Sequence, residues 1–233
     1  VQEARERGIH IDRRFEVLYE NRRDPIAYGP SDDLPHPAVA KVGHRYIIHW
    51  TRASHRPWPT ERAIDFYTAI LRSPTYPREA VHSLCNIIET ARIAGSSRHM
   101  PGRIPTVSFS GVPPAAMIPL MRWRARYAEM SFEPYGVGIP REVAGDHGIY
   151  PVRYHNRDAE AGDGPLWLRQ SEGTKGNWRA EDEWRCRGDL ELSTIPREKL
   201  VCFCRTPDEA REMNNRYGLA AVPLFQCSRT PPD

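Results

Sequence analysis

The chain has 233 residues, enough for one large domain or two small ones. Hydrophobic residues make up 39% and charged residues 27%, a balance typical of a folded globular protein rather than a disordered one. The net charge of +3 is too small a bias to predict binding to nucleic acid or to a membrane. No stretch approaches the roughly 18 consecutive apolar residues of a membrane span, and residues 1–14 lack the apolar core of a signal peptide. With five cysteines, an odd number, the composition favours a soluble cytoplasmic protein with reduced thiols and no membrane partner.

The N-terminal part, residues 1–43, is expected to be irregular. It contains one candidate strand at Phe15–Tyr19 and a loop at Asp24–Val39, which is rich in Pro, Asp and Gly. The pattern then becomes regular: Tyr46–Trp50 is a β-favouring run that ends in polar residues.

Helical spacing of apolar residues follows in two segments. Thr60 can cap the first helix, and Pro77 suits the start of the second. The apolar stripes are Ala63, Phe66, Tyr67, Ile70 and Leu71 in the first, and Val81, Leu84, Cys85, Ile88 and Ala91 in the second. A third helix is expected after Pro113-Pro114, kinked or delayed by Pro119.

The rest of the chain predicts mostly short strands. Thr206, Pro207 and Glu209 have the character of a capping box, so a last helix is expected from there to Tyr217-Gly218. Strands are expected at Thr106–Ser110, Ser131–Ile139, Tyr150–Tyr154, Leu166–Leu168, Leu200–Cys204 and Ala221–Phe225. Residues 44–233 therefore predict a single α+β domain with a mixed or antiparallel sheet and flanking helices.

Two strands carry pairs of polar side chains. On a strand, residues i and i+2 face the same side, so His49 and Thr51 project together and can hold a sugar hydroxyl and a neighbouring amide. Ser108 and Ser110 share a face in the same way. The structural alternatives are a histidine hydrogen-bonded inside the domain and serines that cap the following turn.

Two further elements combine aromatic and acidic residues. Tyr135, just before a glycine, can stack on a flat ring, or it is a core tyrosine at a bend. Residues 178–185 place three acids between two tryptophans and two arginines. If this segment is a strand, Glu181 and Glu183 share one face, and Arg185 can hold a partly desolvated carboxylate. If it is a helix, Glu181 and Arg185 form a solvated i, i+4 pair.

Other chemistries lack a matching pattern. Cys202 and Cys204 are the only close pair of cysteines, and their C-x-C spacing does not fit the C-x₂₋₄-C pairs of structural zinc sites. The apolar run Leu200–Cys204 is expected to be buried core. The chain contains no G-x-x-x-x-G-K-[ST], G-x-G-x-x-G or H-E-x-x-H motif. No metal ligands are therefore predicted.

Six segments in order form a pattern that resembles uncharacterised bacterial proteins, some of whose relatives are linked to phage defence by abortive infection. The segments are Tyr46–Arg52, Ser96–His99, Pro105–Ser110, Pro134–Ile139, Pro151–Tyr154 and Glu181–Leu192. The order of the polar residues resembles that of the ADP-ribosyltransferase superfamily, although the sequences are not closely similar. That superfamily places a His or Arg on an early strand, then a Ser or Tyr element, then a late Glu.

The resemblance implies an ADP-ribosyltransferase-like fold and an enzyme that consumes NAD, by hydrolysis or by transfer to a macromolecular acceptor. Glu183 would stabilise the positive charge that develops as the glycosidic bond breaks, and Glu181 would orient or deprotonate the acceptor. His49 would hold the ribose hydroxyls or the amide, and Tyr135 would stack on nicotinamide. The remaining implied NAD contacts are Thr51, Arg98, Ser108 and Ser110.

Two alternatives remain open. The first is a non-enzymatic binding module of a defence system, in which the arginines 122, 124 and 126 meet an acidic surface or nucleic acid. The second is a metal-dependent nuclease or hydrolase that uses Glu183 and His49 as acid and base, with Asp182 or Asp189 in the same pocket. The transferase hypothesis predicts that Glu183 lies close to His49 in a cleft lined by Tyr135. The binding module instead predicts acids that are exposed or locked in structural ion pairs.

Overall fold

The protein is represented by a computed structural model, which describes residues 34–59, 61–98, 100–121, 123–124, 129–155, 164–171 and 178–226. The expected strand at residues 15–19, the cap residue at position 60 and the arginines at positions 122 and 126 lie outside these residues.

The centre of the fold is a seven-stranded sheet with the order β13-β12-β6-β1-β3-β10-β7. All neighbouring strands are antiparallel except β12 and β13, which are parallel. This confirms the expected α+β class with a mostly antiparallel sheet. In chain order the strands are β1 Tyr46–Trp50, β3 Thr106–Ser110, β6 Gly136–Pro140, β7 Ile149–Pro151, β10 Glu183–Arg187, β12 Val201–Cys204 and β13 Ala220–Pro223.

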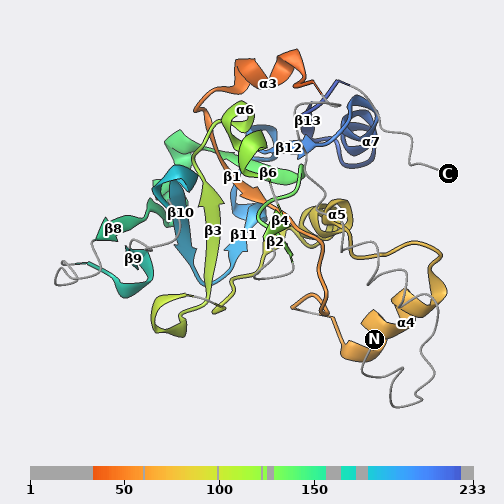
Figure 1. Ribbon diagram of the computed structural model, residues 1–233, viewed down its shortest axis with the longest axis horizontal. Coiled ribbons are helices and arrows are strands. Elements are labelled where there is room, and N and C mark those ends of the chain that lie inside the picture. Colours follow the sequence, from red (N-terminus) through yellow and green to blue (C-terminus); the bar gives the residue numbers. More distant parts are fainter. Residues whose placement is uncertain are drawn as a thin grey trace.

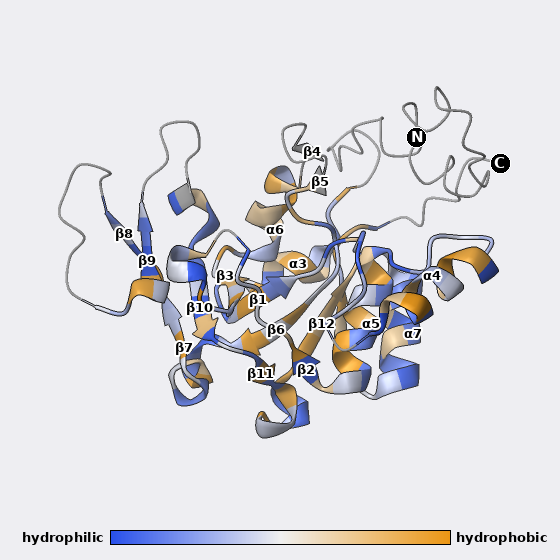
Figure 2. Ribbon diagram, turned by 90° about the horizontal axis from the view of Figure 1, so that it is seen from below, coloured by the Kyte–Doolittle hydropathy of each residue, from blue (hydrophilic) through white to orange (hydrophobic). Residues whose placement is uncertain are grey.

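Helices cover both faces of this sheet (Figures 1 and 2). Helices α5 (Ala80–Thr90) and α7 (Pro207–Tyr217) pack on one face, where Leu84 and Met213 join a buried cluster with Ile47 of β1. Helices α3 (Pro37–Val42) and α6 (Pro114–Met117) pack on the other, in a cluster that contains Ile48 of β1. The alternating side chains of β1 thus serve two separate cores. Among the described helices, none is both long and apolar enough to cross a membrane.

The crossover from β12 through α7 to β13 follows directly from its sequence. Thr206 Oγ1 accepts a hydrogen bond from Glu209 N (3.2 Å), and Glu209 Oε2 accepts one from Thr206 N (3.0 Å), which completes the predicted capping box. Gly218 ends α7 with φ 63°, a conformation that costs glycine little. As expected for a core strand, all four residues of β12 are buried.

Smaller elements surround the sheet. Helix α4 (Ala63–Arg72) is set apart from it (Figure 1). Strand β8 (Arg153–His155) pairs in parallel with β9 (Arg169–Ser171) beyond the β7 edge (Figure 2). Two further antiparallel pairs are β2 (Arg92–Ile93) with β11 (Leu190–Glu191), and β4 (Trp123–Arg124) with β5 (Glu129–Met130). Short 3₁₀ turns are Pro101–Arg103, Ile118–Leu120, Arg141–Val143, Gly145–His147, Leu166–Leu168, Trp178–Glu181, Leu192–Thr194 and Arg197–Lys199.

Three elements differ from the prediction. The helix expected after Pro113-Pro114 stops after about one turn and becomes a 3₁₀ turn at Pro119, because proline cannot donate the next helical hydrogen bond. Within the segment expected to be irregular, α3 forms, since His36 Nδ1 accepts a bond from Ala38 N (3.1 Å) and Val39 enters the core. The expected strand Leu166–Leu168 is a 3₁₀ turn that begins after Pro165, because a short apolar run fits either structure.

Candidate functional site

Three of the predicted residues lie on neighbouring strands of the sheet. His49 is on β1, Ser108 on β3 and Glu183 on β10, and these strands are adjacent in the order β1-β3-β10. The register opposes Ser108 to Arg185, and it opposes Ser110 to Glu183 on one side and to Ile48 on the other. The late glutamate and the early histidine are therefore both close to Ser108 along the sheet.

The register also decides the face on which each side chain lies. Directly opposed residues share a face and alternate along each strand. One face of β1, β3 and β10, called here the Glu183 face, carries Ile48, Ser108, Ser110, Glu183 and Arg185. The opposite face, called here the His49 face, carries His49, Phe109 and Trp184.

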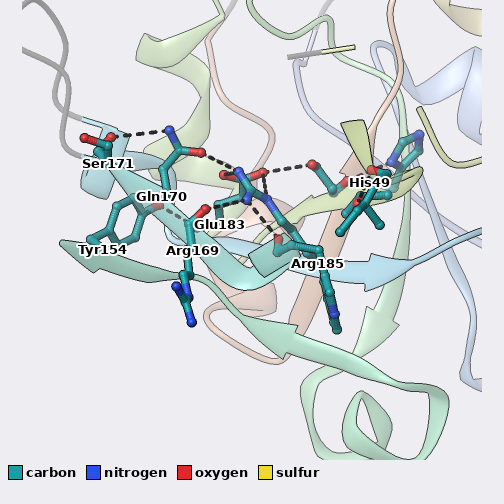
Figure 3. Close-up of polar contacts among 11 residues, drawn as sticks. His49, Tyr154, Arg169, Gln170, Ser171, Glu183 and Arg185 are labelled. Atoms are coloured by element: carbon teal, nitrogen blue, oxygen red, sulfur yellow. Dashed lines mark hydrogen bonds and ion pairs between the residues drawn. The ribbon is translucent and has the colours of Figure 1, made fainter. Parts of the chain in front are cut away.

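His49 and Glu183 thus lie on opposite faces of the sheet and do not meet in one cleft, contrary to the expectation. Figure 3 shows His49 apart from the Glu183–Arg185 pair, with Tyr154 and Gln170 toward the other side. The cause is the pairing of β1 with β3, in which a shift by one residue would decide whether His49 shares the face of Glu183. Ile48, not His49, opposes Ser110, and a shift of one residue exchanges all the side chains of a strand between faces.

On the Glu183 face, the carboxylate of Glu183 is held by two neighbours. Its Oε1 accepts hydrogen bonds from Ser108 Oγ (2.8 Å) and from Arg185 Nε (2.8 Å), and its Oε2 accepts one from Arg185 Nη2 (2.9 Å). The Arg185 side chain is 2% exposed and that of Glu183 is 16% exposed. This is a bidentate ion pair shielded from water, so its geometry is strongly constrained.

Arg185 also fastens the outlying strands to the sheet (Figure 3). Its Nη1 donates to the carbonyl oxygens of Trp167 (3.0 Å) and Arg169 (3.2 Å), and its Nη2 donates to Gln170 Oε1 (2.6 Å). With the two bonds to Glu183, all five N–H groups of the guanidinium have acceptors. The segment that leads into β9 is therefore docked against β10 through one buried side chain.

Tyr154 of β8 is the aromatic residue that lies beside Glu183. Its Oη accepts a long hydrogen bond from Glu183 N (3.4 Å), and burial, more than any neighbouring charge, raises the pKa of the phenol to about 12. Because Oε2 accepts one hydrogen bond and Oε1 two, the partly exposed carboxylate retains acceptor capacity on Oε2. Oε2 can therefore accept a further hydrogen bond from a hydroxyl group of a ligand.

Tyr154 is not among the site residues predicted from the sequence. Its segment, Pro151–Tyr154, was part of the pattern of resemblance, but nothing local distinguishes this tyrosine from the others. The contact arises because β8 passes beyond the β7 edge and reaches the start of β10.

The hydrogen bond that His49 makes on its own face fixes the tautomer of the neutral ring. Its Nδ1 lies 2.9 Å from the carbonyl oxygen of Ser108 and must donate to it, which leaves Nε2 as an acceptor. Burial lowers the pKa of the imidazole, and this effect exceeds the raising effect of the bond to Ser108. The ring of Phe109 meets it edge to face at 5.8 Å. A neutral imidazole in this place can accept a proton or a hydrogen bond.

Thr51 and Tyr135 are structural. Thr51 Oγ1 donates to the carbonyl oxygens of Ala80 (2.8 Å) and Tyr135 (3.2 Å), which ties β1 to the start of α5. Tyr135 is 8% exposed, and its Oη donates to Glu209 Oε1 (2.8 Å). The tyrosine is thus a core residue at a bend rather than a stacking platform, because helix α7 covers its ring.

The two acids before Glu183 lie outside strand β10 and do not share its Glu183 face. Strand β10 begins at Glu183, while Glu181 belongs to a 3₁₀ turn in which its carbonyl oxygen accepts a bond from Ser110 Oγ (2.6 Å). Asp182 has a positive φ of 41°, and its carboxylate pairs with Arg141 (3.3 Å). The expected common face of Glu181 and Glu183 does not form, because the chain turns at Asp182.

Arg98 and Asp189 lie at the other end of β3. Arg98 is exposed and its N–H donates to Ser96 Oγ (3.2 Å), while Ser96 pairs with Thr106. Asp189 pairs with Arg92 and accepts a bond from Gly95 N (2.7 Å). Neither residue joins Glu183. In the part of the chain that the structure describes, no group of three or more His, Cys, Asp and Glu side chains is arranged to hold a metal ion.

Comparison of the chain with protein-family models, with curated proteins and with solved structures finds no match. The contacts around Glu183 are therefore the basis on which a function is assigned.

Proposed function

We propose that the protein is an enzyme that cleaves the bond between nicotinamide and ribose in NAD, with Glu183 beside the sugar. The observation that carries the proposal is the fixed carboxylate of Glu183, which Ser108 and Arg185 orient while Oε2 keeps acceptor capacity. A carboxylate preorganised in a dry site stabilises positive charge without having to reorient during the reaction. Cleavage of a nicotinamide–ribose bond develops such charge on the ribose ring.

In this proposal the electron pair of the C–N bond leaves with nicotinamide, and the ribosyl cation lies next to Glu183. A ribose hydroxyl donates to Oε2, and the hydroxyl of Tyr154 lies at the backbone N–H of the same glutamate. Attack by water yields ADP-ribose and a proton, and attack by an acceptor group yields an ADP-ribosylated product. The acceptor is unspecified.

The order of residues along the sheet supports an ADP-ribosyltransferase-like fold as part of the same proposal. His49, Ser108 and Glu183 occur in chain order on the three adjacent strands β1, β3 and β10. The resemblance to defence-associated bacterial proteins makes depletion of NAD during phage infection the proposed setting.

The saturated hydrogen bonding of Arg185 favours a second candidate, the non-enzymatic binding module. A glutamate that neutralises a buried guanidinium and joins β9 to β10 has a sufficient structural role. In that case, Glu183 is a locked ion-pair partner and the protein has no NAD-cleaving activity.

Nicotinamide release from NAD separates the two candidates. The purified chain should release nicotinamide, and Glu183→Gln should lower the rate by about 100-fold or more, the scale expected for loss of a charge-stabilising group. Glu191→Gln is the matched control, because this glutamate is exposed and pairs only loosely with Arg92 (3.5 Å). Absence of release from the wild-type chain, with no NAD binding by calorimetry, would reject the enzyme and favour the binding module.

A further inference from the structure

Asp182, the residue before Glu183, has an uncommon backbone conformation. Its φ is 41°, in the left-handed region that residues other than glycine rarely adopt. In the part of the chain that the structure describes, two other non-glycine residues have a positive φ, Ala91 at the end of α5 and Arg103 in a 3₁₀ turn. Conformations of this kind cluster at functional sites, where the surrounding structure holds them in place. The contacts around Asp182 show what holds it here.

The left-handed conformation turns the chain where β10 begins. In a continuous strand, Glu181 and Glu183 would share one face. Instead, Glu181 belongs to a 3₁₀ turn, and its carbonyl oxygen accepts a hydrogen bond from Ser110 Oγ (2.6 Å). The carbonyl oxygen of Asp182 accepts one from Gly111 N (2.8 Å). The end of β3 thus binds both carbonyl groups that precede Glu183, which becomes the first residue of β10.

Arg141 closes this turn from the His49 face of the sheet. Its Nη2 donates to the carbonyl oxygen of Gly111 (2.8 Å) and to Oδ2 of Asp182 (3.3 Å). Its Cζ lies 5.1 Å from the ring centroid of Trp184, and its backbone N–H donates to the carbonyl oxygen of Arg45 (2.9 Å), just before β1. A Cβ on Gly111 would collide with the Asp182 carboxylate and the Arg141 guanidinium, so these groups are closely packed. One arginine therefore links the ends of β1, β3 and β10.

The backbone of Asp182 contributes more to this arrangement than the charge of its carboxylate. The side chains of Arg141 and Asp182 are 33% and 47% exposed and their contact is long, so the ionic attraction is weak. The bond from Gly111 N to the Asp182 carbonyl oxygen does not depend on the side chain. Glycine and asparagine also adopt the left-handed region, whereas a β-branched residue does so only at a cost. Substitutions at position 182 can therefore separate conformation from charge.

We propose that Asp182 and Arg141 are positioning residues for Glu183, which act by holding the left-handed turn before β10. The turn fixes the carboxylate of Glu183 at Arg185. It also keeps Glu181 off the Glu183 face, where a second carboxylate would compete for the same guanidinium. The effect on catalysis rests on the proposed cleavage of NAD, whereas the effect on the Glu183–Arg185 pair is measurable without any substrate.

The NMR signal of the Arg185 Nε–H group tests the positioning directly, because this group donates to Glu183 Oε1 (2.8 Å) and its chemical shift depends on that bond. Asp182→Val should shift the signal toward that of a free guanidinium, since valine disfavours the left-handed region. Asp182→Asn and Asp182→Gly should leave the signal in place. Arg141→Gln should shift it in the same direction as Asp182→Val, by a smaller amount.

Arg103→Val is the matched control. Arg103 also has a positive φ, of 53°, but its turn leads into the start of β3, whereas Glu183 opposes the end of that strand. The two valine variants carry a similar backbone penalty, and only Asp182→Val should shift the Arg185 signal. Thermal unfolding followed by circular dichroism sets a temperature at which each variant is folded. Asp182→Ala, a milder form of the same change, takes the place of Asp182→Val if the valine variant does not fold.

Turnover of NAD gives a second readout. In Asp182→Val, kcat for nicotinamide release should fall by about tenfold or more with KM unchanged, because Glu183 acts on charge that develops in the transition state. Asp182→Asn should keep the wild-type kcat. If the wild-type chain releases no nicotinamide, the proposed function fails, and the NMR result still decides the role of Asp182. That role is overturned if Asp182→Val leaves the Arg185 signal in place, if Arg103→Val shifts it equally, or if Asp182→Asn shifts it as Asp182→Val does.

Discussion

Arg185 holds the carboxylate of Glu183 in a bidentate pair, with bonds of 2.8 and 2.9 Å and a guanidinium that is 2% exposed. The remaining three N–H groups of the same guanidinium bond to the segment Trp167–Gln170. One buried cation therefore fixes both the candidate catalytic carboxylate and the strand pair that covers it. The following predictions depend on this arrangement and on the two faces of the sheet.

Replacement of Arg185 by methionine should destabilise the protein strongly. The change keeps apolar bulk but leaves Glu183, Gln170 and two backbone carbonyl oxygens without their donor, and breaking a buried pair costs about 3 to 5 kcal/mol. Urea denaturation of wild type and variant measures the loss. Arg187→Met is the control, because Arg187 lies on the same strand but is exposed. Equal stabilities of the two variants would contradict the role of the Arg185 network.

Replacement of Tyr154 by phenylalanine should change the alkaline limb of the stability curve. Burial raises the pKa of this phenol in the folded state to about 12, so its contribution to stability is complete below the unfolded pKa of about 10. Between these values the unfolded chain releases the proton first, and stability falls by up to about 1.4 kcal/mol per pH unit. In Tyr154→Phe this loss should be absent, whereas Tyr150→Phe, at an exposed position, should retain it. Indistinguishable curves for the two variants would show that Tyr154 is not buried beside Glu183.

Replacement of His49 by glutamine should reduce the acid sensitivity of the fold. Burial lowers the pKa of His49 in the folded state, so protons bind first to the unfolded chain as the pH falls through about 6.5. Stability is then lost from that pH down to the lower folded pKa. The glutamine variant should lack this part of the slope, as measured by denaturation at a series of pH values. A wild-type curve that is flat below the unfolded pKa would show that the imidazole charges readily in the folded protein.

Most of the regular elements could be predicted from local sequence. The β-favouring run Tyr46–Trp50, the apolar stripe of Ala80–Thr90 and the capping box at Thr206 all form where their patterns place them. These signals are local, because the periodicity and the capping residues lie within the element itself. Pro119 was correctly expected to disturb the third helix, although its effect is to end the helix rather than to kink it.

The arrangement of the candidate site could be predicted only in part. That Arg185 holds a carboxylate of this segment was expected only if the segment formed a strand, and the carboxylate is that of Glu183. The separation of His49 from Glu183 was not expected, because it depends on which residue of β1 opposes Ser110. The sequence pointed to Tyr135, whereas the tyrosine beside Glu183 is Tyr154, and the reason is similar. Each tyrosine owes its place to a distant neighbour, Glu209 for the first and the start of β10 for the second, and local sequence carries no trace of such contacts.

The measurement that tests the central claim most directly is the mapping of NAD binding onto the two faces of the sheet by NMR. The side-chain amide of Gln170 reports on the Glu183 face, and the indole N–H of Trp184 reports on the His49 face. On titration with NAD, the signals of Gln170 and of the backbone near Tyr154 should shift in the wild-type chain and not in Glu183→Gln. The indole signal of Trp184 should stay in place in both. Shifts confined to Trp184 and His49, or no shifts at all, would contradict the claim that Glu183 forms the NAD site.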